Sequence, residues 1–176
     1  VRTDDARLSI GEGSTKVKGQ YVADTGDFDA TINTQDLPLG TFTKDMTTPI
    51  TGNIDGEIRI LGKNNQVTDA VGAVEGRQIG IHGVVVDTAK ANFTHADNRT
   101  NITVVGTMGD GALSGYGYIQ NGNVDATISG NALPLTALSP IIGQDVDGTL
   151  NTSFAIKGAV DNPNVTGTVW GQEVHY

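Results

Sequence analysis

The sequence has no cysteine, few aromatic residues, no cluster of basic residues and no long apolar run. Without cysteine, the chain can form no disulfide and can offer no thiol nucleophile or thiolate ligand. The net charge of −9 and the scattered lysines and arginines exclude the clustered basic surface that nucleic-acid binding normally requires. No apolar segment approaches the roughly 20 residues of a membrane-spanning helix.

The residues that are present favour β-strands. The 176 residues include 24 glycines, together with many valines, isoleucines and threonines, which fit a pleated strand. Aromatic residues make up only 5% of the chain, so it is poorly supplied for a thick core between two layers. We therefore expect an extended sheet.

Apolar and polar residues alternate along much of the chain. In residues 146–157 the even positions are mostly apolar and the odd positions mostly polar, and residues 54–60 show the same pattern. Such alternation is typical of a strand with one buried and one solvated face. Asn-Gly, Asp-Gly and related turn signals recur about every 8 to 12 residues, the spacing of an antiparallel all-β protein.

The sequence predicts the secondary structure of several individual segments. Residues 81–86, 91–95 and 101–105 are predicted strands, and the helical candidates are short, at 39–46 and 135–142. Each helical candidate follows a Leu-Pro-Leu sequence. The predicted fold class is therefore all-β, an elongated, curved antiparallel sheet with short inserts.

A long internal repeat is the most distinctive feature of the chain. Residues 26–32 and 122–128 share the pattern Gly-(Asp/Asn)-x-Asp-Ala-Thr-Ile, and Leu-Pro-Leu follows at 37–39 and 133–135. Both elements are offset by 96 residues (122 − 26 and 133 − 37). Repetition over a long period is typical of modular architectures and argues against a single catalytic site.

The repeat also predicts how the chain is organised. No linker separates the copies, so we expect one continuous structure over residues 1–176, with repeats at about 22–90 and 113–176. The chain begins at Val1 and ends in strand-like alternation, so we further expect a piece of a longer repetitive protein.

Four short motifs of the second copy point to a family. They are Leu133-Pro134-Leu135, Val146-Asp147-Gly148-Thr149-Leu150, Ile156-Lys157-Gly158 and Asn162-Pro163-Asn164-Val165-Thr166-Gly167. Their order and spacing resemble the repeats of the TamB family, part of the AsmA-like group of envelope proteins in diderm bacteria. The first copy departs from this pattern, because Thr68-Asp69-Ala70-Val71 stands where the second has Asn-Pro-Asn-Val.

This resemblance implies both a fold and a function. Family members look like long curved sheets folded into an open half-pipe, the β-taco, with an apolar interior groove. They are anchored in the inner membrane, extend across the periplasm and pair at their C-terminal end with the outer-membrane barrel protein TamA. The implied function is to conduct phospholipid to the outer membrane, and an older proposal is help in inserting autotransporters and other outer-membrane proteins.

The apolar alternates of the strands would line such a groove. An acyl chain gains about 0.8 kcal/mol per buried CH₂ group, so a carrier must offer continuous apolar contact. No cluster of Lys or Arg is placed to clamp a phosphate headgroup, so the groove is expected to hold the tails alone. The predicted lipid-contacting residues are Phe28, Ala30, Ile32, Ile54, Ile58, Ile60, Ile102, Val104, Val124, Ala126, Ile128, Val146, Leu150, Phe154 and Ile156.

Other interpretations of the alternation remain open. The strands could pack against a second sheet or line a barrel, or the chain could be a surface adhesin built as a β-solenoid. The same residues with exposed strand edges could chaperone unfolded outer-membrane strands.

Tyr116 and Tyr118 could form a carbohydrate platform, although such residues more often face solvent. His82, His95 and His175 match no metal spacing, and no nucleophile or dinucleotide motif is present, so we expect no metal, no cofactor and no enzymatic activity.

Overall fold

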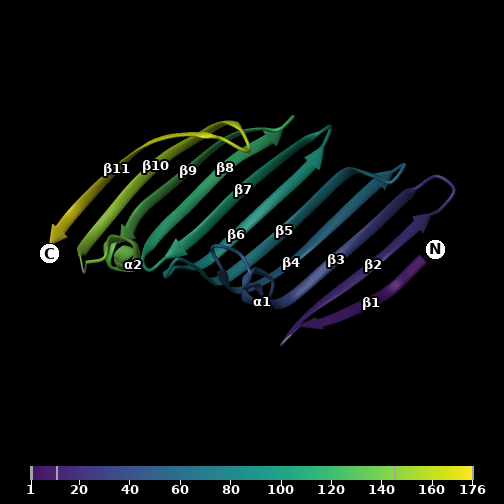
Figure 1. Ribbon diagram of the computed structural model, residues 1–176, viewed down its shortest axis with the longest axis horizontal. Coiled ribbons are helices and arrows are strands. Elements are labelled where there is room, and N and C mark those ends of the chain that lie inside the picture. Colours follow the sequence, from purple (N-terminus) through teal and green to yellow (C-terminus); the bar gives the residue numbers. More distant parts are fainter. Residues whose placement is uncertain (1, 11, 145, 176) are drawn as a thin grey trace.

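The computed structural model describes residues 2–10, 12–144 and 146–175, which form one antiparallel β-sheet with short helical inserts (Figure 1). Eleven strands pair in the order in which they occur in the chain, and β1 and β11 are the two edges, so the sheet is not closed into a barrel. The strands are β1 (Arg2–Ile10), β2 (Gly13–Val22), β3 (Asp27–Pro38), β4 (Ile50–Lys63), β5 (Gln66–Ile81), β6 (Val84–Ala96), β7 (Arg99–Met108), β8 (Gly111–Gln120), β9 (Asn123–Pro134), β10 (Asp147–Ala159) and β11 (Asn164–His175).

The prediction of an all-β antiparallel sheet is confirmed. Two-residue turns with left-handed backbone at both positions join several strands, at Asn64-Asn65 (φ 53° and 61°), Asp97-Asn98 (49° and 61°) and Asn121-Gly122 (50° and 72°). Asn, Asp and Gly tolerate this conformation, which matches the twist of a hairpin. Each strand pairs with its neighbours in sequence, whereas a β-solenoid would pair each strand with one a full coil away.

One predicted strand is wrong. Residues 81–86 do not form a single strand, because Ile81 ends β5 and Val84 begins β6. His82 and Gly83 form a tight turn between them, with φ of 51° and 82°. The apolar run on both sides of this His-Gly pair concealed the turn. The strands predicted at 91–95 and 101–105 lie within β6 and β7.

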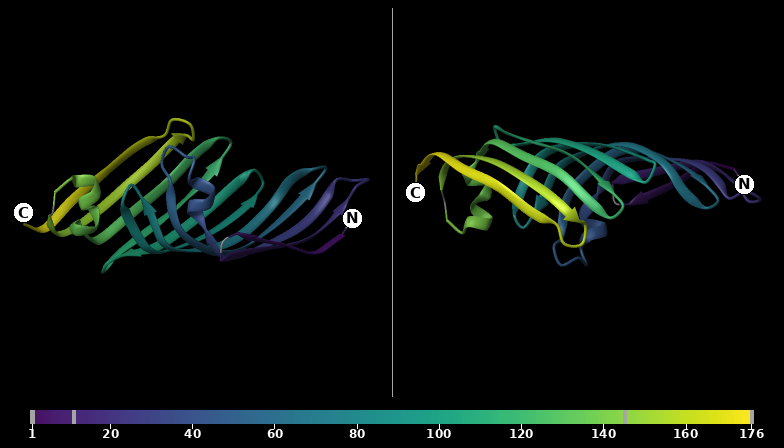
Figure 2. Two further views of the ribbon diagram at one scale, coloured as in Figure 1. Left: turned by 60° about the horizontal axis from the view of Figure 1, so that its bottom comes forward. Right: turned by 90° about the horizontal axis from the view of Figure 1, so that it is seen from above.

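The two helical inserts are confirmed; the first is shorter than predicted, and the second covers the predicted range, residues 135–142. They are α1 (Leu39–Thr43) in the first and the 3₁₀ turn η1 (Leu135–Leu138) with α2 (Ser139–Ile142) in the second. Both inserts project from the same side of the sheet (Figure 2). In the first insert, the Thr43 hydroxyl accepts a hydrogen bond from the Ile50 N–H at 2.9 Å, which ties the end of α1 to the start of β4.

A backbone irregularity recurs at nearly the same spacing as the sequence repeat. Asp36, Gln78, Ala132 and Glu173 each adopt left-handed backbone inside a strand, with φ between 48° and 52°. The first and third of these residues are 96 positions apart (132 − 36), and the second and fourth are 95 apart (173 − 78). At Asp36 and Ala132 one extra residue is inserted into the strand, which shifts the alternation by one position and returns the following leucine to the apolar face. Leu37 therefore pairs with Ile54, and Leu133 with Leu150.

The left-handed residues Asp36 and Ala132 each form a β-bulge, and in both copies a side-chain hydrogen bond, which we call the clamp, holds the bulge. The Asp36 N–H donates to Asp55 Oδ1 at 2.9 Å, and the Ala132 N–H donates to Asn151 Oδ1 at 3.0 Å. The two acceptors are again 96 residues apart (151 − 55). An aspartate and an asparagine therefore perform the same task, because each presents a side-chain oxygen to the same backbone group.

Burial is sparse and local in the described part of the chain. The buried apolar residues are Met108, Leu133, Leu135 and Val146, and no large side chain is fully buried. Leu135 is the first residue of the second insert, Leu133 lies two positions before it, and Val146 lies between the insert and β10. Apart from contacts made by the inserts, the strands make their substantial contacts with their neighbours in the sheet. Figure 2 shows this single layer from two further sides.

Candidate functional site

The pairing of the strands aligns apolar side chains into continuous rows. Two central rows run from β2 to β11, a distance of about 43 Å at 4.8 Å per strand. The first row is Val17, Ile32, Ile58, Gly72, Phe93, Ile102, Gly117, Ala126, Ile156 and Val165. The second row is Thr15, Thr34, Gly56, Val74, Ala91, Val104, Gly115, Ile128, Phe154 and Gly167.

Two flanking rows extend the same face. One is Gly19, Ala30, Ile60, Ala70, His95, Thr100, Ile119, Val124 and Gly158. The other is Leu37, Ile54, Gly76, Ala89, Gly106, Leu113, Gly130, Thr152 and Val169. We call these four rows the apolar face. They contain no Asp, Glu, Lys or Arg.

Most charged side chains of the strands lie on the opposite, polar face. Arg59 pairs with Asp29 at 2.8 Å, Lys90 with Glu75 at 3.3 Å, and Lys157 with Asp125 at 3.2 Å. A further network joins Arg77 to both Asp36 and Asp55. Arg99 stacks on Tyr118, 3.6 Å from the ring centre, on the same face. Asp87 is an exception, because it alternates with Ala89 and Ala91 on β6 and therefore lies on the apolar side, beyond the end of the rows. There it accepts hydrogen bonds from Gln78 Nε2 and the Gly109 N–H. The charged pairs named above lie on one side, so the two faces of the sheet differ in polarity.

The pKa values of two aspartates reflect these contacts. A hydrogen bond from the Arg59 guanidinium lowers the pKa of Asp29. The pKa of Asp55 is lowered first by the hydrogen bond from the Asp36 N–H and then by the hydrogen bond from Arg77. Both carboxylates are therefore ionised at neutral pH, which keeps the polar face hydrated.

Most of the predicted lipid-contacting residues lie on the apolar face. Twelve stand in the four rows, namely Ala30, Ile32, Ile54, Ile58, Ile60, Ile102, Val104, Val124, Ala126, Ile128, Phe154 and Ile156. Phe28, paired with Tyr21 and Gly62, and Leu150, paired with Leu133, extend this face along their strands. Val146 lies apart from them, because it precedes β10 and is only 7% exposed.

The apolar face also contains residues that the sequence analysis did not select. Phe93, Val74 and Ala91 occupy the middle of the central rows, and Leu113 and Ile119 stand on β8. The alternation in β6 and β8 could have identified them. The abundance of alanine and glycine on this face of β5 weakened the signal there.

Phenylalanine rings cover glycines on this face. Phe28 stands opposite Gly62, Phe93 opposite Gly72, and Phe154 opposite Gly167. A methyl group added to Gly72 would lie 2.5 Å from Phe93 Cε1, so the ring lies over the glycine. Aromatic cover of strand glycines flattens the surface and replaces their missing side chains.

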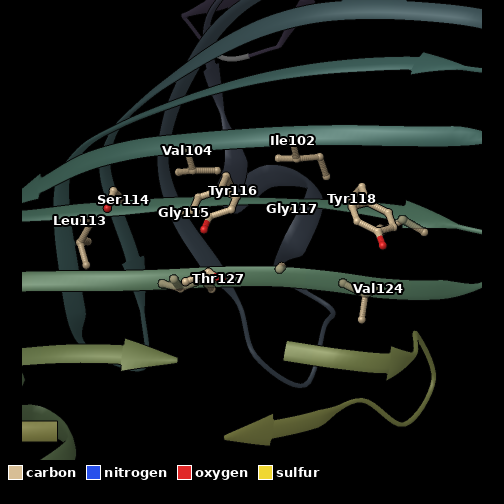
Figure 3. Close-up of a pocket in the computed structure, with 13 residues that line it drawn as sticks. Ile102, Val104, Leu113, Ser114, Gly115, Tyr116, Gly117, Tyr118, Val124 and Thr127 are labelled. Atoms are coloured by element: carbon tan, nitrogen blue, oxygen red, sulfur yellow. The ribbon is translucent and has the colours of Figure 1, made fainter. Parts of the chain in front are cut away.

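A hollow opens on the apolar face over β8 (Figure 3). Its volume is about 300 Å³, and its walls come from Ile102 and Val104 on β7 and from Val124, Ala126 and Ile128 on β9. Gly115 and Gly117 lie between these walls. Val104 and Ile128 are 36% and 43% exposed, which shows that this part of the face is open to solvent.

No family model, curated protein or solved structure matches this chain. Among the described residues, no helix is both long and apolar enough to cross a membrane. Over the same residues, no group of three His, Asp or Glu side chains is arranged to hold a metal ion. The fold and the site therefore define a class by structure alone, an open antiparallel sheet with one mainly charged face and one apolar face that is partly exposed to solvent.

Proposed function

We propose that this chain is a non-enzymatic segment of a periplasmic bridge whose apolar face conducts phospholipid between the inner and outer membranes. The full-length protein would be anchored in the inner membrane of a diderm bacterium and would work with a TamA-like outer-membrane barrel. This proposal follows the resemblance to the TamB family, and the transported ligand would contact the protein through its acyl chains.

The observation that carries the proposal is the uncovered apolar face. Four rows without a charged side chain run across the sheet, and solvent reaches Val104 and Ile128 in the second row. Uncovered apolar surfaces of this extent mark interaction sites. Each CH₂ group that leaves water for such a surface gains about 0.8 kcal/mol, and the rows offer that gain along about 43 Å.

The open half-pipe is part of the same proposal. The sheet has two free edges and is not a barrel, and the strands bend along their length in Figure 2. Glycines at strand positions such as Gly56 and Gly117 permit local bending. In a half-pipe, the apolar face would become the inner wall and the ion pairs would remain outside.

Site-specific photocrosslinking in the native envelope tests this function. Val104 and Val105 are adjacent and chemically identical, and they lie on opposite faces of β7. A photoreactive residue at position 104 should capture labelled phospholipid at least tenfold more than one at position 105. Equal capture at both positions, or none at position 104, would contradict the proposal.

The edge of the sheet favours a second candidate function. Residues 164–172 of β11 contain no charged residue and no proline, whereas β1 contains Arg2, Asp4, Asp5 and Arg7. Long uncharged edges accept further strands, so this edge suits a chaperone for unfolded outer-membrane strands. The same photocrosslinking distinguishes the candidates, because a chaperone would yield captured polypeptide at position 104 in place of phospholipid.

A further inference from the structure

The hollow over β8 contains two successive glycines of the apolar face that no large side chain covers. Elsewhere a neighbouring side chain often covers a glycine, as Phe93 covers Gly72 and Leu133 covers Gly130. Gly115 and Gly117 occupy successive positions on the apolar face and have no large cover. An added methyl group would meet Thr127 O at 3.3 Å and Ile128 Cγ1 at 3.5 Å at position 115, and Ala126 and main-chain atoms at position 117.

The uncovered glycines leave a trough that follows β8. Leu113 and Ile119 stand at its two ends, six residues apart, which corresponds to about 20 Å along a strand. The walls stand on β7 and β9, each about 4.8 Å from β8. A chain of carbon atoms lying over the two glycines would reach both walls at contact distances of about 4 Å. Figure 3 shows Gly115 and Gly117 on the strand between Val104 and Thr127.

We infer that this trough seats one unbranched acyl chain of a phospholipid, lying along β8 and therefore across the long axis of the sheet. The inference rests on the proposed function and adds the place and the orientation of one bound acyl chain. The trough is one strand wide, so it suits a single straight chain. Its lining has no charged side chain, so the phosphate headgroup stays outside, in water.

The orientation of the bound chain has a consequence for transport. A chain seated along β8 must leave the trough sideways, over Val104 or Ile128, to reach the next strand. The acyl chain would then advance in steps of one strand, about 4.8 Å each. Movement along a smooth stripe would leave no preferred position for the chain.

Photolabelling of the purified protein tests the seat. The probe is a phospholipid with a diazirine midway along one palmitoyl chain, and mass spectrometry maps the labelled residues. We expect labelling at the trough residues on β7, β8 and β9 to exceed that on β3–β5 at least fivefold. Unlabelled phospholipid with straight chains should compete at least fivefold better than phospholipid with methyl-branched chains.

Two variants of β8 provide the matched comparison. Gly115→Leu fills the trough from its floor, whereas Ser114→Leu adds the same side chain to the opposite face of the same strand. Gly115→Leu should reduce trough labelling at least fivefold, and Ser114→Leu should leave it unchanged. The competition between straight and branched chains uses the unaltered protein, so it remains decisive if Gly115→Leu fails to fold.

The outcomes separate this inference from the proposed function. Labelling spread evenly over the apolar face would overturn the seat and leave the lipid-conducting face intact. Absence of labelling anywhere on the apolar face would overturn both. Labelling of the trough by diazirine palmitate as free fatty acid, but not by the phospholipid, would overturn the phospholipid as ligand.

Discussion

At the scale of single residues, one side-chain oxygen at each clamp stabilises a β-bulge and so keeps the apolar residues of that strand on one face. Asp55 and Asn151 occupy equivalent places in the two copies and accept the same kind of backbone hydrogen bond. The bulge would otherwise leave an unpaired N–H inside the sheet. Nothing in the alternation of the sequence revealed this role, because both residues resemble ordinary solvent-facing polar positions.

The clamp predicts a pH dependence of stability. The pKa of Asp55 lies below its ordinary value of 3.8, so the stabilisation from its ionised form is present above that value. It is lost as the pH falls through the lower folded-state pKa. Asp55→Asn keeps an oxygen acceptor, as in the second copy, so its unfolding free energy should fall less on acidification from pH 7 to pH 3 than that of the unaltered protein.

Urea unfolding followed by circular dichroism measures this effect. Asp55→Ala removes the acceptor and should cost about 1 kcal/mol at pH 7, while Asp55→Asn should cost clearly less. If the asparagine variant is destabilised as much as the alanine variant, the hydrogen bond to the bulge is not what matters at this position.

The glycines of the apolar face provide a second test at residue scale. A methyl group at Gly62 would clash with the Phe28 ring and would lie 2.7 Å from Gln66 O, so Gly62→Ala should cost about 1 to 3 kcal/mol. Gly115→Ala, on the same face, meets nothing closer than 3.3 Å and should change stability by less than about 0.5 kcal/mol. Similar losses at both positions, measured by urea unfolding, would show that the ring does not cover Gly62.

At the scale of elements, the second insert supplies much of the little burial that the sheet has. Leu135 is 6% exposed at the start of η1, whereas Ile141 in α2 is 66% exposed. Leu135→Ala should therefore cost about 2 to 4 kcal/mol, because it leaves a cavity in one of the few buried clusters. Ile141→Ala is the matched control and should change the unfolding free energy by less than about 0.5 kcal/mol. Thermal and urea unfolding of the two variants would contradict this account if their losses were equal.

The strands and turns were largely predictable from sequence, and the reasons are local. The alternation of apolar and polar residues correctly placed Ile58 and Val104 in β-strands. Asn-Gly and Asp-Asn pairs indicated hairpin turns, because these residues tolerate positive φ. The turn at His82-Gly83 was missed because an apolar run continues on both sides of it. The bulges at Asp36 and Ala132 were missed because an aspartate or an alanine in left-handed backbone carries no signal in the sequence.

The candidate site was predictable only in part, for a similar reason. Alternation within a strand identifies a face, and this was enough for residues such as Ile32 and Ile156. Register between strands decides which glycine meets which ring, and it depends on bulges that cannot be read from the sequence. Val146 shows the limit of alternation, because it continues the pattern of β10 and yet lies before that strand, in a buried position.

At the scale of the whole molecule, the separation of charge between the faces is the main feature. Ion pairs such as Arg59–Asp29 and Lys90–Glu75 hold the polar face in water, and the rows of the apolar face lack any charged residue. A protein with a sealed core would place its largest apolar side chains inside, whereas this sheet leaves Val104 and Ile128 partly exposed. Part of the apolar face is therefore in contact with solvent.

The most direct test of the account is phospholipid binding by two charge variants of neighbouring valines. Val104 and Val105 are 36% and 54% exposed on opposite faces of β7, so neither Val104→Asp nor Val105→Asp places a carboxylate in a dry core. Binding of a fluorescent phospholipid should weaken about tenfold in Val104→Asp, because the bound acyl chain would desolvate the new charge at a cost of about 1 to 3 kcal/mol. Val105→Asp should bind like the unaltered protein. Equal affinities for the two folded variants would contradict the claim that the apolar face binds lipid.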